Sequence, residues 1–275
     1  MTSDRPNGVS AGETGPLSFD TSVAHQARVY DYLLGGKDNY AADRAAAEAA
    51  LRVYPEWAFT ARANRALLGR VVRFLAADAG IRQFLDIGTG IPTAGNTHQV
   101  AQDVAPESRV VYVDYDPIVL AHARALLTSH ESGATEYIDA DLRDTGTILA
   151  QAAELLDFAK PVAVTLIAIL HAIPDSDDPY AIVRRLMDAV PSGSYLALSH
   201  LGLEFLAPET LEEMQGMSSN IQQRFAYRSG EQVARFFEGT DLVDPGLVKV
   251  EEWRPEPGNG DQGSSALWCA VGRKR

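Results

Sequence analysis

The sequence has little cysteine, few histidines and no long hydrophobic run. Its single cysteine, Cys269, excludes a disulfide bond within the chain, and six scattered histidines offer no clustered zinc ligands. The longest apolar stretch, Val162 to Leu170, is far shorter than the roughly 20 residues that cross a bilayer. We therefore expect a cytoplasmic protein with no membrane partner and no metal site.

Basic side chains are also scarce relative to acidic ones. The chain has 24 Lys and Arg residues against 37 Asp and Glu residues, a formal net charge of −13. Such a charge disfavours a broad surface for nucleic acid, so we expect no nucleic-acid partner. Arg62, Arg65, Arg70 and Arg73 lie on one helical stretch, which we interpret as a solvated face, with a local basic patch as the alternative.

The remaining composition suits one large α/β domain with a small appendage, since 46% of 275 residues are hydrophobic. Residues 1–16 are polar and rich in Gly and Pro, and we predict a disordered tail there. Helical spacing of apolar residues predicts an N-terminal helical cap, or lid, over residues 17–80. Its helices are expected at Val23–Leu34, at Ala41–Leu51 and around Leu67–Leu75.

Short apolar runs alternate with helical stretches over residues 81–275, which is typical of a doubly wound α/β sheet. Helices are expected to begin after Asp116 and after Asp178, because each precedes a proline suited to the first helical position. The predicted strands are Gln83–Ile87, Val110–Val113, Thr135–Ile138, Val162–Leu170 and Tyr195–Leu198, followed by an antiparallel pair near Leu247–Val250 and Ala266–Val271.

The first predicted strand ends in Asp86-Ile87-Gly88-Thr89-Gly90. In an open α/β sheet, the turn between a strand and the next helix is where ligands bind, and glycines let the backbone approach a ligand closely. An acid before the first glycine suits a ligand with an ammonium group better than a dinucleotide, whose pyrophosphate it would repel. The turn therefore favours a ligand with an ammonium group, and together with the acids that end the next two strands it indicates a nucleoside with an amino-acid tail.

Two further acids end the next strands. Asp114 is placed to accept hydrogen bonds from both hydroxyls of a ribose. Asp141 could accept from an adenine amino group, and the amide of Leu142 could donate to the ring. Asp116 is expected to cap a helix, with ligand contact as the alternative.

The order Asp-x-Gly-x-Gly, strand-end Asp114 and Asp141-Leu142 resembles the class I S-adenosylmethionine-dependent methyltransferases. Over about residues 17–275 the chain also resembles an actinobacterial S-adenosyl methyltransferase family formerly of unknown function. The segments that carry this resemblance are Ala27–Tyr40, Gln83–Asn96, Val111–Pro117 and Trp253–Pro255.

The resemblance implies a Rossmann-like sheet of strand order 3-2-1-4-5-7-6 with the last strand antiparallel, and S-adenosyl-L-methionine as cofactor. One departure is Pro92, where related loops have a third glycine. The next helix is expected to begin there, and Thr93, Gly95 and Asn96 are candidates to replace the missing N–H. The full set of expected cofactor contacts is Asp86, Ile87, Gly88, Thr89, Gly90, Asn96, Asp114, Tyr115, Asp141 and Leu142.

Two groups of residues are candidates beyond the cofactor. His171, at the end of the fourth predicted strand, is a candidate general base, and a structural histidine is the alternative. Polar residues beside a glycine pair suggest a lid that lines the cofactor or substrate cavity, and a capped helix end at the surface is the alternative. These lid residues are Arg28, Tyr30, Asp31, Lys37, Asp38, Asn39 and Tyr40.

We thus predict an S-adenosylmethionine-dependent methyltransferase that acts on a small-molecule acceptor and yields S-adenosyl-L-homocysteine. A protein that only binds or senses S-adenosylmethionine is one alternative. An NAD-dependent oxidoreductase is the other, although Thr93 stands where the third fingerprint glycine belongs. The acceptor, the methylated atom, any metal assistance and the oligomeric state, monomer or homodimer, stay open.

Overall fold

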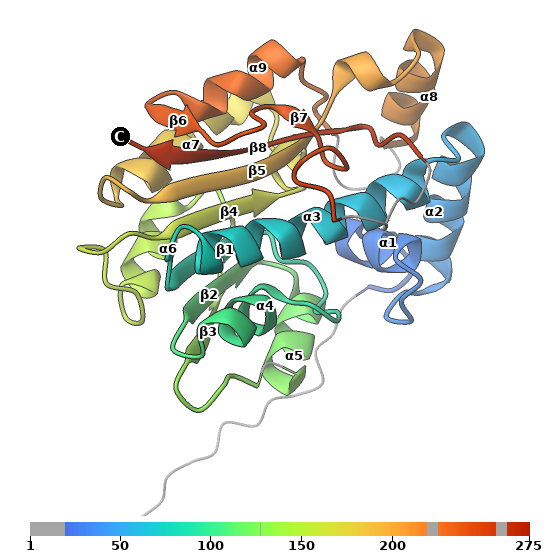
Figure 1. Ribbon diagram of the computed structural model, residues 1–275. Coiled ribbons are helices and arrows are strands. Elements are labelled where there is room, and N and C mark those ends of the chain that lie inside the picture. The colour runs from blue at the N-terminus through green and yellow to red at the C-terminus, as the bar shows by residue number, and fades with distance from the viewer. Residues whose placement is uncertain (1–19, 127, 219–224, 257–262) are drawn as a thin grey trace, which may run out of the picture.

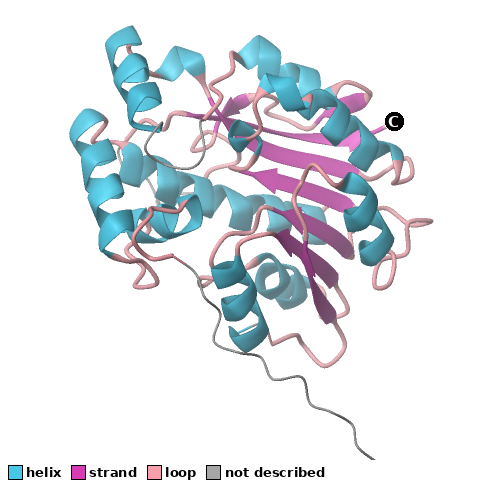
Figure 2. Cartoon of the chain, turned by 180° about the vertical axis from the view of Figure 1, so that it is seen from behind, coloured by secondary structure: helices cyan, strands magenta, loops and turns pink. Residues whose placement is uncertain are grey.

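The computed structural model describes residues 20–126, 128–218, 225–256 and 263–275. The predicted tail at residues 1–16 lies outside them. In the described residues a central sheet is covered by helices on both faces, as Figures 1 and 2 show. The predicted doubly wound α/β fold is confirmed.

The strands are β1 Gln83–Ile87, β2 Arg109–Asp114, β3 Ala134–Asp139, β4 Ala163–Ile167, β5 Tyr195–Leu201, β6 Thr240–Leu242, β7 Val248–Lys249 and β8 Leu267–Lys274. The helices are α1 Gln26–Leu33, α2 Ala41–Val53, α3 Trp57–Ala77, α4 Thr97–Val104, α5 Pro117–Leu126, α6 Thr145–Ala152, α7 Pro179–Asp188, α8 Pro208–Ser218 and α9 Gly230–Ala234. Short 3₁₀ turns occur at Leu170–Ala172, Asp175–Asp177, Leu203–Phe205 and Arg235–Phe237.

The sheet has the order β3-β2-β1-β4-β5-β8-β6, with β7 paired to β8 beside this path. Strands β1 to β5 are parallel to one another, and β8 runs antiparallel to β5. The expected order is therefore confirmed, with β8 in the place of the seventh strand. The edge strand at Thr240–Leu242 was not predicted, because Asp241 and Leu242 are exposed and the segment has no apolar pattern. The strand predicted near Leu247–Val250 forms only the two-residue β7.

The fourth strand is shorter than predicted. It ends at Ile167, Ala168 has a φ of 55°, and a 3₁₀ turn begins at Leu170. The prediction of a strand over Val162–Leu170 was wrong because Leu170 stays fully buried after the strand ends. A run of apolar residues indicates that the segment is buried, but it does not distinguish a strand from a buried turn.

Both predicted helix starts after Asp116 and Asp178 are confirmed. A side-chain oxygen of Asp116 accepts from the backbone N–H of Ile118 at 2.8 Å, and one of Asp178 accepts from that of Ala181 at 3.1 Å. These bonds satisfy N–H groups that have no partner within the helix.

The helix expected to begin at Pro92 begins at Thr97 instead. Asn96 is its N-cap residue and forms a capping box with Gln99. The helix begins here because the capping box joins the side chain of Asn96 to the backbone of Gln99 and the side chain of Gln99 to the N–H of Asn96, whereas Pro92 offers no such side chain. Residues 91 to 95 are therefore loop.

The core has two halves, one on each face of the sheet. Alternate strand residues point to opposite faces, so Phe84 joins the half covered by α3 and α4, and Leu85 joins the half covered by α6 and α7. Leu67 and Val71 of α3 belong to the first half. The third helix of the predicted cap is thus also part of the domain core.

Helices α1, α2 and α8 gather at the end of the sheet where β1, β2, β4 and β5 have their carboxyl ends (Figure 1). Helix α1 contacts α2 and α3, and α2 contacts α8. The division into a cap over residues 17–80 and a main domain stays a prediction. None of the helices in the described ranges combines the length and the apolar composition that a membrane crossing requires.

Candidate functional site

A cavity of about 560 Å³ lies between the carboxyl ends of the strands and the helices gathered there. Its wall comes from α1, α2, α3 and α8, from the turns after β1, β2 and β4, and from β5 and β8. In an open α/β sheet this is the edge where ligands bind, because the turns after the strands point their free backbone groups outward there. Of the predicted site residues, Tyr30, Asp86, Gly88, Thr89, Gly90, Asp114, Tyr115 and His171 line it.

Asp86 lines the cavity, and only 6% of its surface is exposed. Its carboxylate accepts hydrogen bonds from the hydroxyls of Thr97 at 2.6 Å and Thr165 at 2.7 Å. Burial raises the pKa of Asp86, while these two hydrogen bonds act to lower it. The carboxylate is therefore held in one orientation beside the glycine turn.

The glycine turn depends on two residues with left-handed backbone. Gly88 has a φ of 76° and Gly90 a φ of 63°, which L side chains rarely adopt. A Cβ on Gly88 would lie 2.5 Å from the side chain of Ile169, whereas a Cβ on Gly90 would have no protein atom within 4 Å. Gly88 thus allows β1 and the β4 turn to pack, and Gly90 leaves space that is open to a ligand.

Asp114 links the second strand to this turn. Its carboxylate accepts from the backbone N–H of Gly90 at 2.9 Å and from those of Tyr115 and Asp116 at 2.9 and 3.1 Å. Burial raises the pKa of Asp114, and the backbone hydrogen bonds oppose that effect. Tyr115, next to it on the cavity wall, is 43% exposed.

Four of the predicted cofactor residues lie outside the lining of this cavity. Asp141 accepts hydrogen bonds from Arg143, including one of 2.8 Å to its side chain. Ile87 and Leu142 are buried in the core on the α6 and α7 side of the sheet. Asn96 caps α4 and accepts from Thr93 N–H at 3.1 Å.

Arg65 lines the cavity, although its sequence pattern suggested a solvated helix face. One of its terminal nitrogens donates to the carbonyl of Ala94 at 3.1 Å and to the side chain of Asn96 at 3.0 Å. These hydrogen bonds connect Arg65 to the loop that follows Pro92. In the described part of the chain, its guanidinium forms no ion pair. Burial lowers the pKa of Arg65, and the charge of Asp86 counters this. Helical spacing alone did not reveal which arginine faces the glycine turn.

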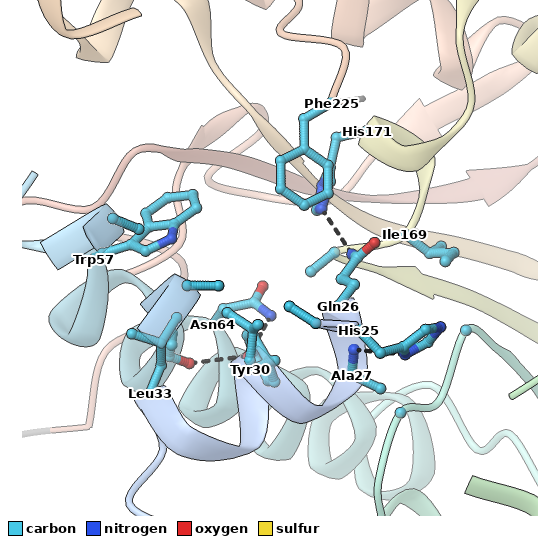
Figure 3. Close-up of a pocket in the computed structure, with 18 of the residues that line it drawn as sticks. His25, Gln26, Ala27, Tyr30, Leu33, Trp57, Asn64, Ile169, His171 and Phe225 are labelled. Atoms are coloured by element: carbon cyan, nitrogen blue, oxygen red, sulfur yellow. Dashed lines mark hydrogen bonds between the residues drawn. The ribbon is translucent and has the colours of Figure 1, made fainter. Parts of the chain in front are cut away.

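His171 lies in the 3₁₀ turn after β4 and is 6% exposed. Its Nε2 is 3.3 Å from Nε2 of Gln26 in the first turn of α1, and its ring meets that of Phe225 edge to face at 5.0 Å between centroids (Figure 3). Burial lowers the pKa of His171 well below its usual value, and the charges of His200 and Arg228 act in the same direction. The imidazole is therefore neutral and able to accept a proton.

The turn that carries His171 is held by the buried Arg228. The guanidinium donates to the carbonyls of Leu170 at 3.1 Å and Ile173 at 2.9 Å, and it forms a 2.6 Å ion pair with Asp175. A terminal nitrogen of the guanidinium also lies 2.6 Å from Nε2 of His200. Burial is the larger cause, and the charge of Arg228 the next, of a pKa of His200 lowered to about 3. Arg228 thus fixes the turn and disfavours any second positive charge nearby.

Most of the predicted lid residues contact one another within the cap. Arg28 lies 3.2 Å from Asp43 in a buried ion pair, and its guanidinium stands over the ring of Tyr40. Asp31 accepts from the backbone N–H of Asp38 at 2.9 Å and from the side chain of Asn39 at 2.8 Å. Arg28, Asp31, Lys37, Asp38, Asn39 and Tyr40 are not among the described residues that line the cavity, and their contact with a ligand stays a prediction.

The cavity suits the cofactor that the sequence implies. The open space beside Gly90 and the carboxylate of Asp114 fit a ribose, and the turn itself carries no side chain that would occupy this space. The described residues contain no group of three or more His, Cys, Asp or Glu side chains arranged for a metal ion.

Comparisons with known proteins agree with this geometry. A family model described as S-adenosyl methyltransferase matches residues 12–275. A DUF574 family protein from Streptomyces avermitilis is 47% identical, with a TM-score of 0.90 over 93% of this chain and 99% of that one. A candidate methyltransferase from Thermobifida fusca is 42% identical, with a TM-score of 0.84 over 93% of this chain and 97% of that one.

More distant structures share the fold. An S-adenosylmethionine-dependent methyltransferase from Anabaena variabilis is 17% identical and has a TM-score of 0.53 over 77% of this chain and 84% of that one. A search of curated proteins gave no match. No comparison favours an NAD-dependent oxidoreductase or a protein that only senses the cofactor. The chain belongs to the S-adenosyl methyltransferase family and is an S-adenosylmethionine-dependent methyltransferase.

Proposed function

We propose that the glycine-turn end of the cavity binds S-adenosylmethionine and that the rest of the cavity binds a small-molecule acceptor. The observation that carries this proposal is the position of Asp114, which faces the cavity and is tied to Gly90 by a 2.9 Å hydrogen bond. A carboxylate so placed accepts the two ribose hydroxyls. Gly88 and Gly90 then allow the backbone to approach the nucleoside.

Arg65 is proposed to bind the carboxylate of the methionine part. Its guanidinium is mostly enclosed, lines the cavity and forms no ion pair with any described carboxylate. An enclosed cation without a counter-ion is unfavourable, so an anionic ligand group would stabilise it. Asp86, whose charge acts on Arg65, is proposed to face the ammonium of the same amino-acid part.

The adenine end is proposed to lie beside Tyr115, whose half-exposed ring borders Asp114. Asp141 and Leu142 stay candidates for hydrogen bonds to the base. For Asp141 this contact would compete with the hydrogen bonds from Arg143.

His171 is proposed as the base that receives the proton of the acceptor. Bound S-adenosylmethionine supplies a sulfonium methyl group that an oxygen or nitrogen nucleophile attacks in line. The protein contributes alignment and an enclosed site, and alignment alone can lower a barrier by roughly 7 to 11 kcal/mol. A neutral imidazole has a ring nitrogen with a free lone pair, and His171 passes the proton on to water rather than remaining charged near Arg228.

The cofactor assignment is tested by titration calorimetry with S-adenosylhomocysteine. Asp114→Asn is expected to lower the affinity by about tenfold or more, since hydrogen bonds to charged groups contribute roughly 1.5 to 3 kcal/mol. Asp139→Asn is the matched control, because Asp139 ends the neighbouring strand opposite Asp114 in register and is exposed. Equal losses in the two variants, or no binding by the wild-type protein, would contradict the proposal.

Cytoplasmic location stays a prediction from the sequence.

A further inference from the structure

Among the described residues that line the cavity, permanently charged side chains lie at one end. Among the described residues that line it, the side chains with a permanent charge are Arg65, Asp86 and Asp114. All three belong to the glycine-turn end assigned to the cofactor. The opposite part of the wall is built mainly from apolar side chains, which include Leu33, Trp57, Met214, Met217 and Phe225.

Helix α2 determines how much room this apolar part has. It presents Ala42, Ala46, Ala49 and Ala50 to the cavity, at the spacing that places residues on one helix face. Any larger side chain at these positions would fill the space between α2 and the residues across from it. In Figure 3, Trp57 stands on the opposite side of the open space from His171 and Phe225.

The apolar part contains one strongly buried polar side chain with unmet hydrogen-bonding capacity. Nδ1 of His171 is buried without a hydrogen-bond partner, and its Nε2 has only the 3.3 Å contact with Gln26 among the described residues. A buried imidazole that lines a cavity and is not fully satisfied is more favourable when a ligand completes its hydrogen bonds. The contact with Gln26 is long enough to be exchanged for one with a ligand.

From this distribution we propose that the methyl acceptor is an uncharged, largely apolar small molecule whose hydroxyl or amine lies beside His171, with its apolar body against the alanine face of α2. This inference rests on the proposed function, since it requires the cofactor at the glycine turn. The acceptor's lone pair forms the bond to the methyl carbon, and sulfur keeps the electrons of the broken bond. The acceptor's proton passes to Nε2 of His171 and then to water.

The test uses 2-naphthol as an uncharged acceptor mimic and naphthalene-2-sulfonate as its charged counterpart, both titrated into protein saturated with S-adenosylhomocysteine. We expect 2-naphthol to bind at least about tenfold more tightly than the sulfonate, because an unpaired charge in an apolar site is unfavourable. Sulfonate affinity equal to or above that of 2-naphthol overturns the proposal, as does the absence of 2-naphthol binding.

Variants on two faces of α2 locate the site. Ala46→Phe fills the cavity and is expected to weaken 2-naphthol binding at least about tenfold, since overfilling a packed space is unfavourable. Ala45→Phe is the matched control, because Ala45 is exposed on the same helix and does not line the cavity. Ala49→Phe serves as a second test if Ala46→Phe does not fold.

The outcomes separate this inference from the proposed function. Affinity for S-adenosylhomocysteine is measured on each variant and is expected to equal that of the wild-type protein. Unchanged 2-naphthol affinity in both cavity-facing variants overturns the acceptor site while leaving the cofactor site intact. Failure of the wild-type protein to bind S-adenosylhomocysteine overturns the proposed function itself.

Discussion

The hydroxyl of Ser199, on β5, donates a 2.6 Å hydrogen bond to Oδ1 of Asn64 on α3. The same hydroxyl accepts from the backbone N–H of Ala168 at 2.9 Å, and Nδ2 of Asn64 donates to the hydroxyl of Tyr30 at 2.9 Å. A continuous chain of hydrogen bonds therefore joins α1 to Ala168, the left-handed residue that follows β4. The cap and the turn that carries His171 are held in one arrangement by this chain.

Ser199→Ala is expected to lower the free energy of unfolding by about 1 to 3 kcal/mol, because it leaves buried polar groups of Asn64 and Ala168 without partners. Urea denaturation followed by circular dichroism measures this change. Ser192→Ala, at an exposed position, is the control and should change little. A loss no larger than that of the control would show that the chain of hydrogen bonds does not support the fold.

The two glycines of the turn are expected to respond differently to alanine. Both have a left-handed backbone, which costs an L residue about 1 to 2 kcal/mol. Gly88→Ala adds a clash with Ile169, so it should lose more stability, and Ile169→Ala in the same chain should restore part of it. Gly90→Ala should remain folded but lose affinity for S-adenosylhomocysteine, because its Cβ enters the space assigned to the ligand. Thermal denaturation and calorimetry separate the two effects, and equal behaviour of the two variants would contradict the assignment.

Arg65→Ala is expected to weaken S-adenosylhomocysteine binding by about tenfold or more, since charge-assisted hydrogen bonds contribute roughly 1.5 to 3 kcal/mol. Its affinity for 5′-methylthioadenosine should stay near that of the wild-type protein, because that compound lacks the amino-acid part. Arg62→Ala, at an exposed position of the same helix, is the control. Equal losses for both ligands would place Arg65 elsewhere than at the carboxylate.

The buried histidines predict how stability changes with pH. The pKa of His171 in the folded protein lies well below the value near 6.5 in the unfolded chain, and that of His200 is about 3. Below about pH 6.5 the unfolded chain therefore binds protons that the folded protein does not, and stability falls as pH falls. Above that pH both states are neutral at these residues and contribute no pH dependence.

His171→Gln is expected to reduce the slope of unfolding free energy against pH by an amount that rises from about 0.7 kcal/mol per pH unit at pH 6.5 to about 1.4 near pH 5, since up to one proton fewer is taken up on unfolding. Urea midpoints at several pH values provide the slope. An unchanged slope would mean that His171 already takes up a proton in the folded protein. It would then be unsuited to act as a neutral base.

Several parts of the fold follow from local sequence alone. Asp116 and Asp178, each before a proline, mark helix starts because a capping carboxylate and a fixed φ act within a few residues. The strands β1 and β2 are recognisable because both sheet faces are covered there and their central residues are buried and mostly apolar. The turn at Asp86–Gly90 and the acid at Asp114 likewise stand out, since a glycine turn after a buried strand is a local pattern.

Other features depend on packing between distant segments. The end of β4 and the short β6 could not be predicted, because burial of Leu170 and pairing of Thr240 with Lys274 are decided by tertiary contacts. Arg65 resembled its exposed neighbours on α3, and only the approach of the Pro92 loop encloses it. The sequence by itself thus determined the sheet class and the glycine turn, whose signals are local. Tertiary structure alone decided which of the cap residues face the cavity, because that depends on how α1, α2 and α8 pack over the strand ends.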